Sequence, residues 1–220
     1  MNRTQRSRYE PGPDDLVRAL EAAGITDERL LEAFRRVRRA GFVPKASLAD
    51  AYRDVPIPIG HEQVTTQPSL TARMIQALEL RGREKVLEVG TGLGFQTAIL
   101  ASLSREVFSM EWFADLADEA RRRLQTVGLH NLEVVTGDGT LGLPQYAPFD
   151  AILVSAAAPI VAPPLARQLA DTGRLVQPIG PGGNDVVTLF RKRGGRLIPA
   201  SEVTGAYFVP LQGNYGARVR

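Results

Sequence analysis

The chain has 220 residues, 44% hydrophobic and 23% charged, which is the balance of a globular protein with enough apolar side chains for one sizeable core. It has no cysteine, and its two histidines lie far apart, which excludes disulfides and a cysteine nucleophile and disfavours a metal site. The net charge of +3 is too small to indicate a nucleic-acid partner, and no apolar run suits a membrane span or a signal peptide, so we expect a cytoplasmic protein.

The start of the chain predicts a helical segment. Residues 1–10 have almost nothing to bury, so we expect a disordered terminus there rather than a transit peptide. One helix is expected from Pro13 to about Gly24, and a second from Thr26 through four arginines between 35 and 39. We interpret those arginines as a solvated face that complements the helix C-terminus, with a nucleic-acid or acidic-peptide contact as the alternative.

A long irregular loop is predicted over 45–68, where prolines recur and no helical period is present. Such loops often carry function, and the stretch 59–68 is dense in small polar groups. A helix over 69–80 should follow it. We therefore expect 11–80 to supply helices and an active-site loop, packed on a cofactor-binding domain over 81–220 as one structural unit.

The stretch that follows, 85–96, predicts a cofactor site. A short apolar strand containing Glu88 leads into glycines at 90, 92 and 94, and then into a helix over 95–103. This order brings bare backbone N–H groups up to a ligand, and glycine leaves room for that approach. Phe95 stands where a dinucleotide motif has its third glycine, so the spacing favours S-adenosylmethionine over a nicotinamide cofactor.

Two more acidic residues follow predicted strands. The second strand ends on Glu111, 21 residues after Gly90, a distance at which a carboxylate accepts hydrogen bonds from both ribose hydroxyls of a nucleoside. The third strand, 132–135, leads into Asp138 and Gly139. The carboxyl end of such a strand lies where open α/β sheets bind ligands, so we expect Asp138 to accept from an adenine amino group.

The alternation of strands and helices from 85 to 179 predicts the fold class. The remaining elements are expected as helices over 114–127 and 164–170, strands over 149–154 and 173–179, and an antiparallel hairpin from 185–191 through a turn at 193–195 to a strand reaching Val209. The prediction is a doubly wound, mostly parallel, seven-stranded Rossmann-like α/β sheet, with a helical N-terminal segment and a C-terminal hairpin.

Short motifs occur along roughly residues 30–216 in an order that is specific to one family. They are Phe42-Val43-Pro44, Ile59-Gly60, Gln63 through Pro68, Val86 through Gly92, Gly137-Asp138-Gly139, Pro148 through Ile152, Leu175-Val176 and Phe208 through Leu211. With these motifs the chain resembles the protein-L-isoaspartate (D-aspartate) O-methyltransferases, a family of class I S-adenosylmethionine enzymes. The polar stretch before the glycine turn separates that family from other methyltransferases.

The resemblance implies methyl transfer from S-adenosylmethionine to the α-carboxylate of an isoaspartyl residue, and to the β-carboxylate of a D-aspartyl residue, in damaged proteins and peptides. The ester closes to a succinimide that reopens partly to normal aspartate, which begins repair. A carboxylate with a pKa of ~3.5 is ionised at neutral pH, so no general base is required. Thr66, Thr65 and Gln63 are expected to orient this carboxylate as the catalytic residues.

The predicted cofactor-binding residues follow the glycine turn, the strand ends and the polar loop. They are Glu88, Gly90, Thr91, Gly92, Leu93, Gly94, Gln96, Glu111, Trp112, Asp138, Gly139, Val64, Gln67 and Thr71. S-adenosyl-L-homocysteine would be the cofactor product, and no metal is expected. We expect a monomer whose partners are isoaspartyl proteins and peptides, not nucleic acid or membrane.

The chain departs from the family pattern in the polar loop. Thr66 stands where the family commonly has serine, and Glu62-Gln63-Val64 stands where it often has Gly-Gln-Thr. Threonine keeps the hydroxyl, so we expect Thr66 to replace the serine. Glu62 brings a negative charge beside an anionic substrate, so it either faces away or selects another substrate. His61 is expected to be an ordinary loop residue.

Three alternatives remain beside the repair activity. The departures in the loop keep open a carboxyl methyltransferase that acts on an aspartyl residue of one peptide, as in natural-product tailoring. A nucleic-acid methyltransferase is less favoured, because the chain has no Asn-Pro-Pro-aromatic motif and no aromatic-rich basic stretch. A non-catalytic binding protein is disfavoured because the cofactor motif is intact.

Overall fold

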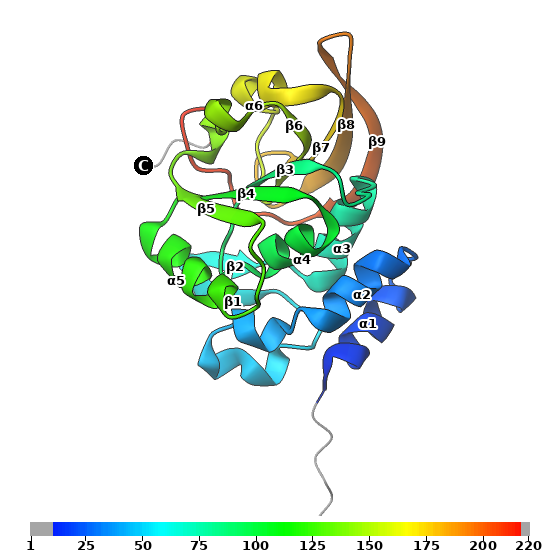
Figure 1. Ribbon diagram of the computed structural model, residues 1–220, viewed down its shortest axis with the longest axis vertical. Coiled ribbons are helices and arrows are strands. Elements are labelled where there is room, and N and C mark those ends of the chain that lie inside the picture. The colour runs from blue at the N-terminus through cyan, green and yellow to red at the C-terminus, as the bar shows by residue number, and fades with distance from the viewer. Residues whose placement is uncertain (1–10, 217–220) are drawn as a thin grey trace, which may run out of the picture.

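A mixed sheet of seven strands forms the centre of the molecule (Figure 1). The computed structural model describes residues 11–216, so the terminus predicted to be disordered lies outside the described residues. The strands are β3 (Lys85–Val89), β4 (Glu106–Glu111), β5 (Leu132–Thr136), β6 (Phe149–Val154), β7 (Leu169–Ile179), β8 (Asp185–Arg193) and β9 (Arg196–Ala206). Their order is β5-β4-β3-β6-β7-β8-β9, in which β3 to β7 are parallel and β8 and β9 are antiparallel. The predicted fold class is confirmed, with the last two strands in sequential order.

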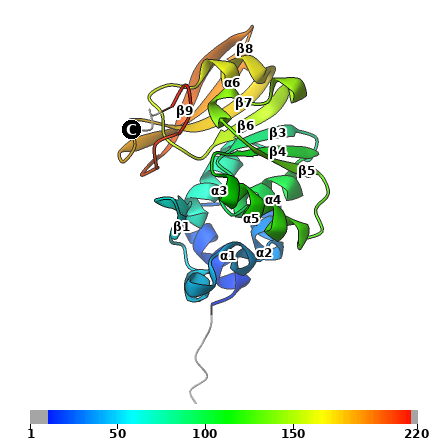
Figure 2. The ribbon, with the colours of Figure 1, turned by 90° about the vertical axis from the view of Figure 1, so that its left-hand side faces the viewer.

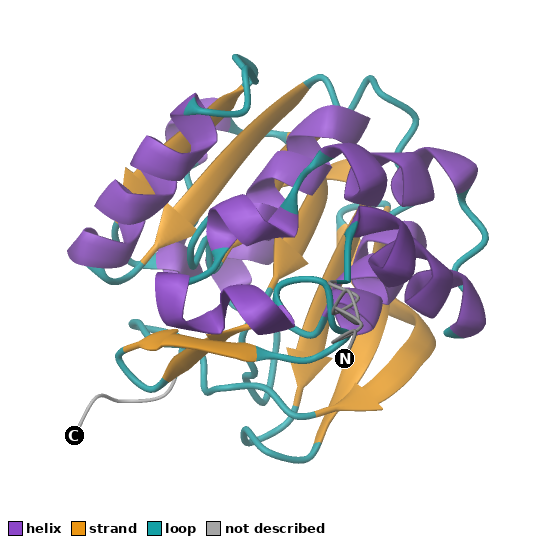
Figure 3. Ribbon diagram, turned by 90° about the horizontal axis from the view of Figure 1, so that it is seen from below, coloured by secondary structure: helices purple, strands orange, loops and turns teal. Residues whose placement is uncertain are grey.

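Helices cover both faces of this sheet (Figure 2). One face is covered by α3 (Pro68–Ala77), α4 (Phe95–Leu103) and α5 (Ala114–Gln125), and the other by α6 (Pro163–Gln168). Outside them, α1 (Pro13–Ala22) packs on α3, and α2 (Glu28–Arg36) packs on α4. Figure 3, seen from below, shows this layer of helices in front of the strands. The two faces of the sheet bury separate apolar clusters, which explains why the central strands are nearly continuous apolar runs.

Several predicted elements have different ends in the structure. The second helix begins at Glu28 rather than Thr26, because the Asp27 carboxylate caps it by accepting from two backbone N–H groups of the first turn. The helix predicted to reach 127 ends at Gln125, and the helix predicted over 69–80 is the shorter α3. The fifth parallel strand begins at Leu169, four residues before its predicted start, because it follows α6 without a loop.

The prediction of an irregular loop over 45–68 is wrong. The segment contains a 3₁₀ helix over Lys45–Asp50 and an antiparallel hairpin of β1 (Ile57–Gly60) and β2 (Gln63–Thr65). The two residues at the turn, His61 and Glu62, have φ of 51° and 57°. Hairpin turns with positive φ are usually marked by glycine or asparagine at those positions, so the sequence carries no clear signal for this one.

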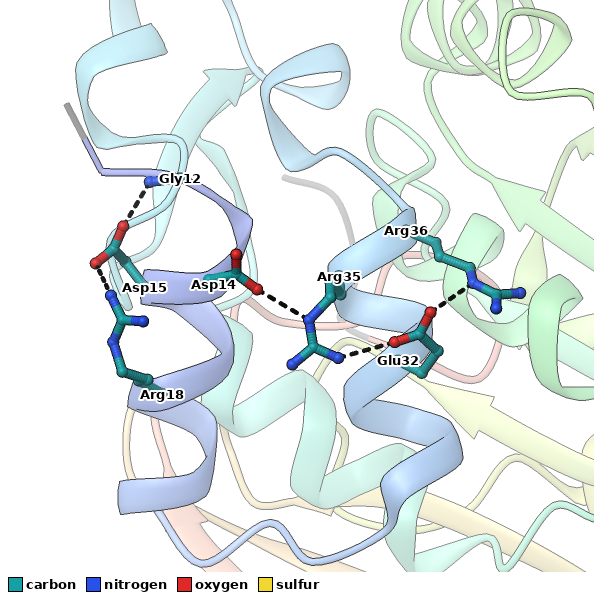
Figure 4. A network of polar contacts seen from close by, with 7 residues as sticks. All are labelled: Gly12, Asp14, Asp15, Arg18, Glu32, Arg35 and Arg36. Atoms are coloured by element: carbon teal, nitrogen blue, oxygen red, sulfur yellow. Dashed lines mark hydrogen bonds and ion pairs between the residues drawn. The ribbon is translucent and has the colours of Figure 1, made fainter.

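The arginines at the end of α2 divide into exposed and buried groups. Arg35 donates to Asp14 of α1 and to Glu32 of α2, and Arg36 donates to Glu32 (Figure 4). These side chains are exposed, as the solvated-face interpretation expects, and ion pairs of this kind add little stability. Arg39 contradicts that interpretation, because it is fully buried in a 3₁₀ helix over Arg39–Phe42.

Candidate active site

A cleft opens at the carboxyl ends of the central strands. From β3 the chain continues to β4 and β5 on one side, and then returns to β6 on the other side, so the strand order reverses at β3. Open α/β sheets bind their ligands at such a switch point. The cleft has a volume of about 900 Å³, its open mouth included. One wall is the glycine turn 90–93 with Glu111, here named the glycine wall, and the opposite wall is Ile59 with 63–66, named the hairpin wall.

The glycine wall keeps room for a ligand. Gly90 has φ of +100°, and a Cβ atom there would lie 3.3 Å from Cβ of Ser155. Gly92 has φ of +56°, and a Cβ atom there would lie 3.2 Å from Cδ1 of Ile59 across the cleft. Any side chain at these positions would therefore be strained and would press on a residue that lines the cleft. Without side chains at 90 and 92, the backbone of the turn itself forms this part of the cleft wall.

Glu111 lies at the end of β4 with both carboxylate oxygens held by the backbone. Gly92 N–H donates to Oε2 at 2.8 Å, and Phe113 N–H donates to Oε1 at 3.0 Å. Burial raises the pKa of Glu111 above the usual carboxyl value, although these backbone hydrogen bonds oppose the shift. Each oxygen keeps a second lone pair, so the carboxylate is oriented to accept from a pair of hydroxyls in the cleft.

Glu88 lies beneath the glycine wall and does not line the cleft. Its carboxylate accepts from Gln96 Nε2 at 2.8 Å and from the hydroxyls of Thr97 and Ser109, which ties β3 to α4 and β4. Burial raises the pKa of Glu88 to about 7, and the hydrogen bonds from Ser109, Thr97 and Gln96 oppose that shift. Gln96 lines the cleft, and its Oε1 is buried without a partner among the described residues, so it is available to a ligand donor.

The hairpin wall offers hydroxyl groups in two different states. The Thr65 hydroxyl accepts from Nη2 of Arg39 at 2.9 Å and from the N–H of Ile57 at 3.2 Å. The Thr66 hydroxyl has no hydrogen-bond partner within residues 11–216, although the residue is half-buried on the cleft wall. Glu62 is exposed at the hairpin tip and does not line the cleft.

The structure brings most of the predicted site residues to the cleft. Lining it are Gln63, Val64, Thr65, Thr66, Thr71, Gly90, Thr91, Gly92, Leu93, Gln96, Glu111, Trp112 and Gly139. Glu88, Gln67, Gly94 and Asp138 do not line it. Gln67 donates to Asp54 at 2.8 Å, and Gly94, with φ of +93°, is the N-cap of α4. The Asp138 carboxylate accepts from Thr140 and from the N–H of Asn214.

The segment 209–212 also lines the cleft, and it is absent from the predicted set. It is fixed beside the end of β6, because Ala157 N–H donates to Val209 O at 2.9 Å and Leu211 N–H donates to Ala157 O at 2.7 Å. Gln212 is part of this lining, and its Oε1 is buried without a partner among the described residues. The rule of strand ends cannot find a segment that returns from the far edge of the sheet.

The cleft is poor in charge. Among the described residues that line it, Glu111 carries the one ionisable side chain. His61 lies outside, stacked on Phe113 with ring centroids 4.2 Å apart and bonded to Asp115 at 2.8 Å. Within 11–216, no group of histidine, aspartate or glutamate side chains could hold a metal ion, and no helix is long and apolar enough to cross a membrane.

Comparison with known proteins identifies the family of the chain. The profile of the protein-L-isoaspartate(D-aspartate) O-methyltransferase family matches residues 12–216. The chain belongs to this family. A protein-L-isoaspartate O-methyltransferase of Trichlorobacter lovleyi is 49% identical over 193 residues, which cover 88% of this chain and 89% of that protein. One of Methanoculleus marisnigri is 46% identical, over 90% of this chain and 89% of its own.

Two solved structures have the same fold. A protein-L-isoaspartate O-methyltransferase that is 27% identical superimposes with a TM-score of 0.83, over 93% of this chain and 67% of its own. A Plasmodium falciparum beta-aspartate methyltransferase, solved in complex with S-adenosyl-L-homocysteine, is 23% identical and has a TM-score of 0.80 over 93% of this chain and all of its own. The second likeness supports the fold alone.

Proposed function

We propose that this chain transfers a methyl group from S-adenosylmethionine to the α-carboxylate of L-isoaspartyl residues in damaged proteins and peptides, and so starts their repair through a succinimide. The observation that carries the proposal is the pairing of the two walls. A cradle for a nucleoside cofactor faces a hairpin that carries the free hydroxyl of Thr66 and the amide of Gln63, whose Nε2 donates to His61 O at 3.0 Å. The chain belongs to the family whose relatives bear this activity in their names.

The residues of the glycine wall fit the cofactor. At Gly90 and Gly92 no side chain would stand between the protein backbone and the cofactor, and the Glu111 carboxylate is held in place to accept from ribose hydroxyls. The unpartnered Oε1 of Gln96 would accept from the ammonium group of its amino-acid portion. The bound cofactor supplies a methyl group on a positively charged sulfur.

The hairpin wall fits a carboxylate acceptor. An isoaspartyl α-carboxylate is ionised at neutral pH, so the reaction needs alignment and not a base. This agrees with a cleft in which Glu111 is the one ionisable residue among the described residues of the lining. The Thr66 hydroxyl would donate to one carboxylate oxygen and hold the other toward the methyl group. Transfer neutralises two opposite charges, so an apolar, water-poor cleft favours it.

The alternative of a dedicated aspartyl peptide substrate is not favoured by the relatives. One of the features that kept it open was Glu62, and this side chain is exposed at the hairpin tip, away from the cleft wall. Its charge therefore does not oppose an anionic acceptor. A cytoplasmic location, a monomeric state, activity on D-aspartyl residues and the lack of a nucleic-acid partner stay predictions.

Methyl transfer to two matched peptides tests the proposal. The peptides have one sequence and differ in a single residue, isoaspartyl in one and aspartyl in the other, and the cofactor carries a labelled methyl group. We expect base-labile label on the isoaspartyl peptide alone. Equal label on both peptides would support the dedicated carboxyl methyltransferase, and label on neither, with the cofactor still bound, would contradict carboxyl methylation of these acceptors.

A further inference from the structure

The buried side chain of Arg39 holds the segment that carries the hairpin wall. Its Nη1 donates to Ala51 O at 3.3 Å and to Arg53 O at 3.0 Å, and its Nη2 donates to Val55 O at 2.9 Å. The fourth acceptor is the hydroxyl of Thr65 at 2.9 Å. All four acceptors lie between residues 51 and 65, so a single guanidinium fixes the path of the chain into the cleft.

This arrangement is costly for the fold. Arg39 is fully buried, and its Nε has no hydrogen-bond partner among the described residues. Its guanidinium, with Cζ 5.8 Å from the ring centroid of Phe95, forms no ion pair there. Burial lowers the pKa of Arg39 to about 10, while the charge of Asp54 opposes that shift, so the side chain remains cationic at neutral pH. A buried, unpaired guanidinium is expensive, and a neutral residue could fill the space. Its presence at this position points to a use for the charge.

The hydrogen bonds of Thr65 show that use. A hydroxyl has two lone pairs and one proton. Both lone pairs of Thr65 are engaged, one by Nη2 of Arg39 and the other by the backbone N–H of Ile57 at 3.2 Å. The proton has no acceptor among the described residues, and Thr65 lines the cleft. A hydroxyl that accepts a hydrogen bond from a cation has a more polarised O–H bond and is a stronger donor, which applies to Thr65 beside Arg39.

We infer that Arg39 makes the Thr65 hydroxyl a fixed hydrogen-bond donor to the carboxylate of the methyl acceptor, so that Thr65 binds the acceptor and Arg39 is its positioning residue. The inference rests on the proposed function. It divides the work of the hairpin wall, in which Thr66 brings a freely rotating hydroxyl and Thr65 a hydroxyl that can only donate. Two donors suit the two oxygens of one carboxylate.

Steady-state kinetics with an isoaspartyl peptide, alongside cofactor affinity measured by calorimetry, test the inference. We expect Thr65→Val to raise the KM for the peptide about tenfold, as expected for the loss of one hydrogen bond to a charged group, while the Kd for S-adenosylmethionine changes less than about twofold. Thr65→Ser keeps the hydroxyl and should restore most of the affinity. Thr188→Val removes a hydroxyl of β8 that bonds Val186 O and serves as the matched control.

A double-mutant cycle tests the role of Arg39. Lysine has a shorter reach and a single nitrogen in place of Nη1 and Nη2, so Arg39→Lys should raise the KM about as much as Thr65→Val does. The double variant should have a KM no higher than that of either single variant. Arg36→Lys, at an exposed site three residues earlier, is the control. If instead the two increases in KM multiply in the double variant, Arg39 supports the loop but does not act through Thr65. That result would overturn the inference.

Two further outcomes are distinct. A wild-type chain that binds cofactor but does not methylate the isoaspartyl peptide contradicts the proposed function. An active wild type whose Thr65→Val variant keeps its KM contradicts this inference alone. If Arg39→Lys loses its cooperative thermal transition, the comparison of Thr65→Ser with Thr65→Val decides, because equal KM values in that pair would overturn the inference without any variant of Arg39.

Discussion

The two walls of the cleft are shaped by different kinds of contact. The glycine wall is made by backbone conformation: positive φ at Gly90 and Gly92, and N–H groups that orient Glu111. The hairpin wall is held by side chains from other parts of the chain, namely Arg39 on Thr65 and Asp115 on His61. A local motif therefore specifies the glycine wall. The hairpin wall depends on the buried cation of Arg39 and the stacked ring of His61, whose contacts with distant residues the sequence does not reveal.

The largest expected effect is on the glycine wall. Gly90→Ala and Gly128→Ala both place a Cβ atom at positive φ, 100° and 68°, so each should cost about 1–3 kcal/mol of stability. Space at Gly128 is open, whereas Cβ at Gly90 would lie 3.3 Å from Ser155 in the cleft. We expect Gly90→Ala to weaken S-adenosylmethionine binding about a hundredfold by calorimetry, while Gly128→Ala binds normally. Equal losses would mean that strain alone is responsible.

The second effect is on catalysis at the hairpin wall. Thr66→Val removes the free hydroxyl and keeps the shape of the side chain, so kcat/KM on an isoaspartyl peptide should fall about ten- to a hundredfold, the range for a hydrogen bond to a charged group. Cofactor affinity should not change. Thr66→Ser should keep most of the activity. Full activity in Thr66→Val would show that this hydroxyl does not contact the acceptor.

The third effect concerns stability and pH beneath the glycine wall. The pKa of Glu88 is raised to about 7 by burial, above the value of an unfolded carboxyl, so the folded state holds this proton more tightly. The contribution of protonated Glu88 to the free energy of unfolding is fully present below pH ~4.5 and is lost as pH rises to about 7. The loss is of the order of 3 kcal/mol.

Glu88→Gln removes that ionisation. Thermal melting of the cofactor-free protein should show the variant gaining stability over the wild type as pH rises from about 4.5 to 7, and a constant difference above that. Glu202→Gln, at an exposed site on β9, is the matched control and should follow the wild type. A difference that stays constant across this pH range would show that Glu88 is ionised throughout.

The smallest effect is at the hairpin tip. His61→Ala removes the stack on Phe113 and the bond to Asp115, both at an exposed position. Contacts of this kind are weak, so the peptide KM should rise by no more than about fivefold. Asp115→Asn, which keeps the ring stack, should have less effect than His61→Ala. If kcat/KM on the isoaspartyl peptide fell further in His61→Ala than in Thr66→Val, the contact at the hairpin tip, and not Arg39, would be the main support of the hairpin wall.

The sequence predicts the sheet and the glycine wall well, because their signals are local. Alternating apolar strands and helices determine the doubly wound fold, and a glycine turn followed by Glu111 at the next strand end indicates where the proposed cofactor site lies. Asp138 follows the same rule of strand ends, yet its carboxylate is engaged by Thr140 and Asn214. Pattern places a residue at the sheet edge, but it does not show where its side chain bonds.

The parts that the sequence does not predict depend on distant contacts. The run of arginines indicates a solvated face, and nothing in that run distinguishes Arg39, whose burial depends on carbonyl groups 12 to 16 residues later. The hairpin is hidden by its turn, in which His61 and Glu62 adopt a conformation that glycine or asparagine usually marks. The segment 209–212 reaches the cleft through bonds to Ala157 that no motif announces.

The most direct test of the central claim follows the fate of the peptide itself. An isoaspartyl peptide is incubated with the enzyme and excess S-adenosylmethionine, and chromatography measures the isoaspartyl and aspartyl forms over time. The account predicts that the isoaspartyl form declines and the aspartyl form accumulates through repeated cycles, with Thr66→Val slower than wild type. An isoaspartyl peptide that remains unchanged beside an enzyme with bound cofactor would contradict it.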